Sequence, residues 1–284
     1  MSDGDVSDGT VPAARDAGDG AGSGAGEPVT LRAHAKLTLG LRITGVRDDG
    51  YHLIDAEMVS LDLHDLVTIT PGRDGIEVTG PFADGVPTDG SNLVARALEL
   101  AGRRAHVSID KRIPHGGGLG GGLTDAAAVL HWAGFGNHAA ALVAASRLGA
   151  DISFCLVGGR ARVNGIGETV EQLTHVERTI TLVIPPLSVS TPAAYRAWDE
   201  LGGPTGEGPN DLELAALTVE PRMRWWRDAI AERIGEPPVL AGSGATWFTE
   251  RAFTDIERDN ALGDLVAEGA RVVVTTTTDA PFAS

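Results

Sequence analysis

Hydrophobic and polar positions alternate along the first folded stretch of the chain. Residues 29–35 and 37–43 each follow a period of two, the pattern of a half-buried β-strand. An Asp-Asp-Gly turn at 48–50 separates them from further strand-like runs. The pattern predicts strands at 29–35, 37–43, 56–63, 66–70, 75–79, 105–110, 160–164, 179–184 and 271–276.

Helix signals lie between these strands. Ser91 is the candidate N-cap and Gly102 the candidate stop of a helix over 92–102. The remaining helices are predicted at 126–132, 138–148, 151–157, 193–201, 211–217 and 222–234. Because helices and strands alternate irregularly, the order favours two α+β units over a doubly wound sheet. We expect an N-terminal domain at 29–178 and a C-terminal domain at 179–284.

One glycine-rich loop is the most informative motif of the chain. Residues 116–122 are all glycine except Leu119, and an alanine-rich helical run follows. Glycine lets another molecule approach the backbone closely, and amides at a helix start face an anion with the helix dipole behind them. Phosphate suits such a surface best. A mobile linker is the alternative, but a strand before and a helix after disfavour it.

Charge narrows the classes of partner. The net charge of −16 and the pI near 4.8 argue against binding to nucleic acid or to an anionic membrane. A site for a polyanion must therefore be locally positive. Lys36 and Lys111 are the only lysines, so both are of interest.

Other features suggest a cytoplasmic protein. The single cysteine, Cys155, lies in an apolar run and is expected to be a buried, inert thiol in a reducing compartment. No apolar run approaches the roughly 20 residues of a membrane span, and the N-terminus lacks the pattern of a secretory signal. Residues 1–28 are rich in Gly, Ala and Asp, which predicts a disordered acidic tail.

The loop fits one known pattern. It lacks the lysine of a P-loop and fits a dinucleotide fingerprint poorly, whereas Pro114 to Gly120 matches P-x-G-x-G-L-G. Here the chain resembles the GHMP kinase superfamily and, within it, the kinases of 4-diphosphocytidyl-2-C-methyl-D-erythritol. Supporting stretches in the family's order begin at 35, 49, 91, 111, 149, 165, 190, 210 and 242, and the Gly-Tyr-His element indicates the cytidyl substrate.

The resemblance implies a fold, a reaction and a catalytic pair. It implies an α+β two-domain GHMP kinase fold, with an N-domain like ribosomal protein S5 domain 2, a ferredoxin-like C-domain and the site between them. The reaction would be phosphoryl transfer from ATP with Mg²⁺. Asp151 would face the acceptor hydroxyl, with Lys36 beside it. A helix N-cap at Asp151 and an exposed strand lysine at Lys36 are the structural alternatives.

The same resemblance assigns the ATP side of the site. Asn92 and Lys111 would lie near the adenosine end, although Lys111 as a solvated loop lysine stays open. Main-chain groups of the loop and one hydroxyl would hold the phosphates, and these residues are Pro114, Gly116, Gly117, Gly118, Leu119, Gly120, Gly121, Gly122 and Thr124.

The resemblance also assigns the acceptor side. Tyr51 and Tyr195 would stack on the two faces of cytosine, and His52 would hydrogen-bond its polar edge. The other implied substrate contacts are Thr38, Thr191, Gly242, Ser243 and Gly244. Without the resemblance, Tyr51 and Tyr195 are packing residues, Thr191 is a helix cap and residues 242–244 are a tight turn.

Some positions depart from the family pattern. Thr38 stands where many relatives have Asn, Leu123-Thr124 where they have Ser-Ser, and His115 where an apolar residue is usual. Two alternatives therefore stay open: a GHMP kinase for another small alcohol, and a non-catalytic relative that binds nucleotide. The partners expected are small molecules, with no nucleic acid and no membrane, for a monomer or homodimer.

Overall fold

The computed structural model describes residues 26–206, 208–279 and 282, so most of the predicted tail at 1–28 lies outside the described residues. Its strands are β1 Val29–Val46, β2 His52–Pro71, β3 Gly75–Thr79, β4 Ala105–Asp110, β5 Arg160–Gly165, β6 Thr169–Leu173, β7 Thr179–Ile184, β8 Val239–Leu240, β9 Trp247–Thr249 and β10 Arg271–Thr278. Its helices are α1 Leu93–Leu100, α2 Gly121–Trp132, α3 Ala139–Ser146, α4 Ile152–Val157, α5 Thr191–Glu200, α6 Glu213–Val219, α7 Met223–Ile234 and α8 Asp255–Ala267. The expected α+β class is confirmed.

Strands β1 and β2 form a long antiparallel hairpin at the centre of the fold. The two strands predicted at 29–35 and 37–43 are one strand, interrupted by a register shift between His34 and Lys36. Such a shift is typical of a β-bulge, which locally bends a strand and re-aims its side chains. Every residue from 33 to 38 is buried, because both faces of β1 are covered at this point.

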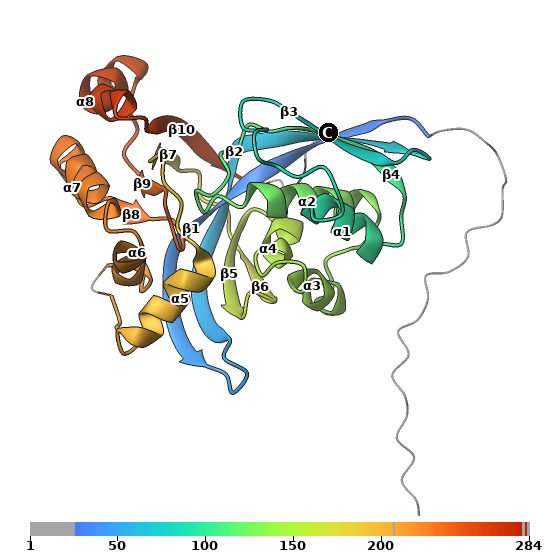
Figure 1. The fold of residues 1–284 in the computed structure, drawn as a ribbon, viewed down its shortest axis with the longest axis horizontal. Coiled ribbons are helices and arrows are strands. Elements are labelled where there is room, and N and C mark those ends of the chain that lie inside the picture. The colour runs from blue at the N-terminus through green and yellow to red at the C-terminus, as the bar shows by residue number, and fades with distance from the viewer. Residues whose placement is uncertain (1–25, 207, 280–281, 283–284) are drawn as a thin grey trace, which may run out of the picture.

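Strand β2 joins the two halves of the fold, an N-terminal half that contains α1–α4 and a C-terminal half that contains α6–α8. Its N-terminal part pairs with β5 and its C-terminal part with β4, while Ser60 and Leu61 pair with the end of β10. The sheet therefore runs in the order β3-β4-β2-β10-β7-β9-β8, with β1 and β5 also paired to β2 and β6 paired to β5. Figure 1 shows α1–α4 on one side of the long hairpin and α6–α8 on the other.

Three hydrophobic clusters hold this arrangement together. One packs α2 and its neighbours on the N-terminal half, and one lies among α7, α8 and the C-terminal strands. The third joins the halves and includes Leu37, Ile113, Leu119, Ile180 and Phe248. Because this third cluster contains residues just before and within the glycine loop, the loop is fixed at the junction of the two halves.

Several sequence predictions are corrected by the structure. The N-cap of α1 is Asn92, whose side chain accepts from the Val94 amide at 2.8 Å, whereas the Ser91 hydroxyl donates to Asp89. The loop at 242–245 connects two strands, β8 and β9, which the sequence did not predict. Strands β6, β8 and β9 and helix α8 were not predicted.

Two minor expectations have clear outcomes. Cys155 is buried as expected, and burial raises the pKa of its thiol to about 12, so it is a poor nucleophile. Among the described residues, no helix has both the length and the apolar character needed to span a bilayer.

Candidate active site

A cavity of about 860 Å³ lies at the junction of the two halves. We call it the junction cavity. Its lining combines residues of the β1–β2 hairpin, the glycine loop, the start of α4, helix α5 and the loop after β8. The predicted site residues on its wall are Lys36, Thr38, Tyr51, His52, Gly118, Gly120, Asp151, Thr191, Tyr195, Gly242 and Ser243.

Lys36 and Asp151 form an ion pair on this wall. The ammonium Nζ lies 2.9 Å from the Asp151 carboxylate, and the lysine side chain is buried while the aspartate is about one-fifth exposed. Lys36 is thus not the exposed strand lysine of the structural alternative. Asp151 does occupy the position before α4, but its side chain makes no capping hydrogen bond there. Its carboxylate is directed to Lys36.

The glycine loop lies directly against this pair. Gly120 has a φ of +72° at the N-terminal end of α2, and a Cβ there would lie 2.7 Å from Cγ of Lys36. Gly118 has a φ of +80°, and a Cβ there would lie 2.7 Å from the Ala241 carbonyl oxygen. Both positions need glycine for conformation and for space. The glycine loop is therefore packed against the Lys36 side chain and against the backbone of the loop after β8.

The loop at 242–244 is held by buried hydrogen bonds. The Asn210 side chain donates to the carbonyls of Leu240 and Gly242 at 2.8 and 2.7 Å. Ser243 and Thr191 hydroxyls lie 2.7 Å apart, which links this loop to the first turn of α5. Gly244 itself does not line the junction cavity. These hydrogen bonds fix the loop so that Gly242 and the hydroxyl-bearing Ser243 and Thr191 line the cavity.

Aromatic rings gather at the end of the cavity formed by the hairpin turn. The ring centroids of His52 and Tyr195 are 4.7 Å apart, and His52 Nε2 lies 2.8 Å from a carboxylate oxygen of Asp199. Burial raises the pKa of Tyr195, so its hydroxyl stays protonated. Tyr51 lies on the turn and is 59% exposed. More than half of the Tyr51 surface is therefore accessible, and the Arg47 guanidinium lies over its ring, 6.0 Å from the centroid.

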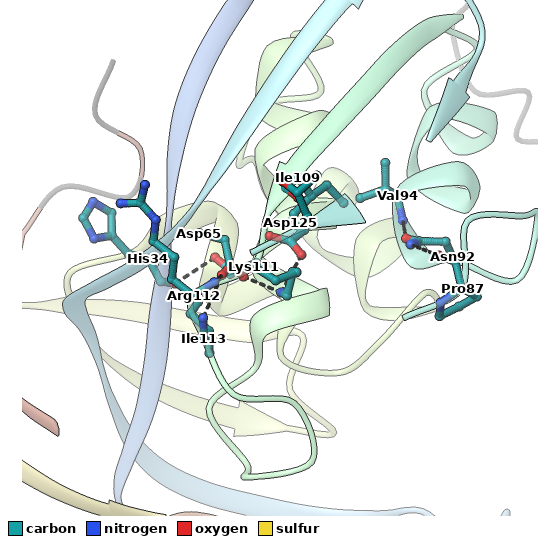
Figure 2. Close-up of polar contacts among 12 residues, drawn as sticks. His34, Asp65, Pro87, Asn92, Val94, Ile109, Lys111, Arg112, Ile113 and Asp125 are labelled. Atoms are coloured by element: carbon teal, nitrogen blue, oxygen red, sulfur yellow. Dashed lines mark hydrogen bonds and ion pairs between the residues drawn. The ribbon is translucent and has the colours of Figure 1, made fainter. Parts of the chain in front are cut away.

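Lys111 occupies a different environment. It is buried beneath the start of α2, and its ammonium contacts the carboxylates of Asp65 and Asp125, the latter at 2.8 Å (Figure 2). Burial alone would lower the pKa of Lys111, but the two carboxylates outweigh it and raise the pKa. Asp65 also accepts from the amides of Arg112 and Ile113, the residues that lead into the glycine loop. We call these three side chains the buried triad.

The remaining predicted residues are not on the cavity wall. The Asn92 side chain caps α1 and donates to the Pro87 carbonyl (Figure 2), and the Thr124 hydroxyl donates to the His34 carbonyl at 2.8 Å. The structure also leaves the following off the cavity lining: Asn92, Lys111, Pro114, Gly116, Gly117, Leu119, Gly121, Gly122 and Thr124. Side chains of Asn92 and Lys111 are thus engaged within the protein.

Three arginines were missed by the sequence analysis. Arg47, Arg147 and Arg196 line the junction cavity together with Lys36, against the carboxylates of Asp49, Asp151 and Asp199. The cavity therefore has more basic than acidic side chains in a chain whose net charge is −16. The position of Arg147 could have been noticed in the sequence, because this residue lies two positions before the Gly-Ala-Asp motif that contains Asp151. The expected local positive charge comes from arginine as much as from lysine.

Comparison with known proteins gives consistent relatives. No family model matches the chain. A 4-diphosphocytidyl-2-C-methyl-D-erythritol kinase from Paracoccus denitrificans is 38% identical over 239 residues, covering 76% of this chain and 84% of that protein. A protein of the same name from Cereibacter sphaeroides is 36% identical over 247 residues, covering 76% of this chain and 87% of that protein.

Solved structures agree with these relatives. A crystal structure of 4-(cytidine 5′-diphospho)-2C-methyl-D-erythritol kinase superposes with a TM-score of 0.67 and 30% identity, covering 88% of this chain and 99% of that chain. A crystal structure of mevalonate kinase gives a TM-score of 0.57 at 13% identity over 89% of this chain and 100% of that chain. The second likeness is evidence for the fold alone.

Proposed function

Because this chain belongs to the 4-diphosphocytidyl-2-C-methyl-D-erythritol kinase family of the GHMP kinases, we propose that it transfers the γ-phosphoryl group of ATP to the 2-hydroxyl of 4-diphosphocytidyl-2-C-methyl-D-erythritol. The single observation that best supports this reaction at this site is the ion pair of Lys36 and Asp151. It lies on the wall of the junction cavity, directly beside the glycine loop at the start of α2.

The glycine loop is suited to hold the triphosphate. It meets the N-terminus of α2, a helix of 12 residues, where free amides and the helix dipole favour an anion. Gly118 and Gly120 line the junction cavity, and their main-chain N–H groups and those of the neighbouring glycines would hold the phosphates, whereas Pro114 has no N–H to donate. The hydroxyl of Thr124 is already donated to His34, which leaves the backbone as the main phosphate ligand.

Asp151 and Lys36 act on the acceptor and the moving group. In a loose transition state the alcohol becomes acidic late, so Asp151 first orients the hydroxyl and then takes its proton. The O–H bond breaks, the new O–P bond forms and the bond from phosphorus to ADP breaks. Lys36 holds the Asp151 carboxylate in place through their ion pair and offsets charge on the transferred group. Positioning and charge neutralisation supply most of the rate.

Mg²⁺ fits this arrangement through oxygen donors. One carboxylate oxygen of Asp151 is held by Lys36, and the other oxygen is a ligand type that Mg²⁺ prefers beside substrate phosphates and water. The bound ion supplies charge neutralisation for the phosphates. Among the described residues of the cavity wall, we assign no carboxylate other than that of Asp151 as a ligand of Mg²⁺.

The acceptor is recognised by its base and by its charge. We place the cytosine between Tyr51 and Tyr195, with His52 at its polar edge and Asp199 fixing the imidazole. Arg47, Arg147 and Arg196 line the same cavity and suit the diphosphate of the acceptor. Thr38, Thr191, Ser243 and Gly242 complete the polar wall.

An acceptor panel tests this function directly. Purified protein with ATP and Mg²⁺ is assayed for ADP release with the cytidyl acceptor and with methylerythritol phosphate that lacks the cytidyl group. We expect turnover with the first and none with the second. Turnover of both at equal rates would contradict base recognition, and turnover of neither would contradict the proposed reaction.

Location and assembly follow as part of the same proposal. The single buried cysteine and the need for ATP suit a reducing cytoplasm. The partners proposed are ATP and the small cytidyl substrate, for a monomer or a homodimer.

A further inference from the structure

Two histidines and an aspartate lie on one face of the β1–β2 hairpin. His34 on β1 is the register partner of His64 on β2, and Asp62 precedes His64 by two residues. Side chains alternate along a strand, so Asp62 and His64 share a face, and a cross-strand partner lies on that face too. The ring centroids of His34 and His64 are 5.3 Å apart. None of the three residues lines the junction cavity.

Both imidazoles have a fixed tautomer. Nδ1 of His34 lies 2.9 Å from the carbonyl oxygen of Leu61, and Nδ1 of His64 bonds to the carbonyl oxygen of Asp62. Since a carbonyl only accepts, each Nδ1 carries a hydrogen, and in the neutral ring the lone pair is therefore on Nε2. Proteins orient metal-binding histidines in the same way, with the second ring nitrogen donating to a carbonyl.

The Nε2 atom of His34 lacks a partner. His34 is 5% exposed, and among residues 26–206, 208–279 and 282 no group hydrogen-bonds to this nitrogen. An unpaired buried polar atom is rare in proteins and calls for an explanation. On the opposite side of β1 in the view of Figure 2 lies the buried triad, so the two clusters are separate.

We propose that His34, Asp62 and His64 bind one divalent transition-metal ion of the zinc class. One ligand atom from each residue lies within 4.8 Å of the other two. Two imidazoles and one carboxylate favour zinc, cobalt, nickel or copper over Mg²⁺, which prefers oxygen alone. Water completes the coordination, as is usual when three protein ligands bind zinc.

Binding requires only a small adjustment. Ligand atoms around tetrahedral zinc lie about 3.3 Å apart, given bonds of about 2.0 Å. His34 is anchored by burial, whereas Asp62 is exposed and His64 is half-buried, so these two side chains can turn toward it. The site therefore consists of one fixed ligand and two that close upon the ion.

Calorimetric titration of the whole protein with Zn²⁺, in buffer without ATP, tests the site. Co²⁺ serves as a second probe, because its visible absorption reports coordination by imidazole nitrogen. We expect one equivalent of either ion to bind and to raise the unfolding temperature. Asp62→Asn and His64→Gln should each weaken binding at least about tenfold, and the double variant should abolish it.

Matched controls separate this site from surface binding. His131→Gln removes an exposed imidazole outside the cluster and should leave the affinity unchanged. The two variants alter an exposed and a half-buried side chain and leave the buried His34 in place, so they should fold like the parent, which circular dichroism verifies. Absence of Zn²⁺ binding to the parent, or equal affinity in the parent and the double variant, would overturn the proposal. Neither outcome depends on kinase activity.

Discussion

The chain has two lysines, and they occupy opposite kinds of site. Lys36 has one carboxylate partner, Asp151, at the wall of the junction cavity. Lys111 has two carboxylate partners, Asp65 and Asp125, and all three side chains are almost fully buried. The pair of Lys36 and Asp151 is partly exposed to the cavity. The buried triad has no such exposure, and Asp65 fixes the segment before the glycine loop by accepting from the amides of Arg112 and Ile113.

This difference shows that proximity to a phosphate loop does not by itself indicate contact with phosphate. Both lysines lie against glycines of the loop: a Cβ at Gly120 would meet Lys36, and a Cβ at Gly121 would lie 2.9 Å from the Lys111 ammonium. Only Lys36 also lines the cavity. We therefore interpret Lys36 as part of the reaction and Lys111 as a positioning residue for the loop.

The largest expected effect is a difference between the two lysines in how much their replacement lowers the free energy of unfolding. Lys111→Met leaves two buried carboxylates without their cation, and we expect the free energy of unfolding to fall by about 3–5 kcal/mol. The matched variant, Lys36→Met, leaves Asp151 one-fifth exposed and able to rehydrate, so the loss should be well below that. Urea unfolding of both variants measures this. Equal losses would remove the distinction between a structural and a functional lysine.

The next effect concerns the acceptor end of the cavity. Tyr195→Leu keeps an apolar side chain but removes the ring on which a base stacks, at a cost of about 1–3 kcal/mol. We expect KM for the cytidyl acceptor to rise roughly 10- to 100-fold, with KM for ATP unchanged. Steady-state kinetics with each substrate varied separately tests this. An equal rise in KM for ATP would contradict the assignment of Tyr195 to the base of the acceptor.

The smallest effect is a pH dependence of the buried triad. Burial raises the pKa of Asp125 to about 7, with the nearby Asp65 adding to the rise and Lys111 opposing it. A carboxyl whose pKa is raised on folding stabilises the protein at low pH, and this contribution is lost as the pH rises through 7. Asp125→Asn is neutral throughout, so its stability relative to the parent should increase by on the order of 1 kcal/mol between pH 5.5 and 8.

The control for this pH effect is an exposed aspartate. The pKa of Asp74 is lowered by Arg104, so its carboxyl is ionised across the whole range from pH 5.5 to 8. Asp74→Asn should therefore differ from the parent by the same amount at both pH values. A stability of Asp125→Asn relative to the parent that falls or stays constant from pH 5.5 to 8 would contradict the raised pKa.

Much of the fold could be predicted from local patterns. The strands at 75–79, 105–110 and 179–184 were predicted with the bounds that the structure gives to β3, β4 and β7, because alternation or β-branched runs mark them clearly. Strands β8 and β9 have two and three residues and are too short for a period to appear. Ser91 and Asn92 are both good caps, so only the backbone geometry distinguishes them.

The site was predicted in part for a similar reason. Motifs such as Gly-Ala-Asp and Gly-Tyr-His can be recognised in the local sequence, and Asp151 and His52 do line the cavity. The buried triad has no such motif: Lys111 meets Asp65 from 46 residues away and Asp125 from 14. Tertiary packing alone brings these charges together. The arginines of the cavity were missed because surface arginine is common in any chain.

The most direct test of the proposed reaction is the turnover of Asp151→Asn. The variant keeps the size of the side chain and its place beside Lys36 but cannot accept a proton. General base catalysis contributes about 10²- to 10⁴-fold. We predict that kcat for ADP release with ATP and the cytidyl acceptor falls by this factor, while both KM values change little. A kcat equal to that of the parent would contradict the account.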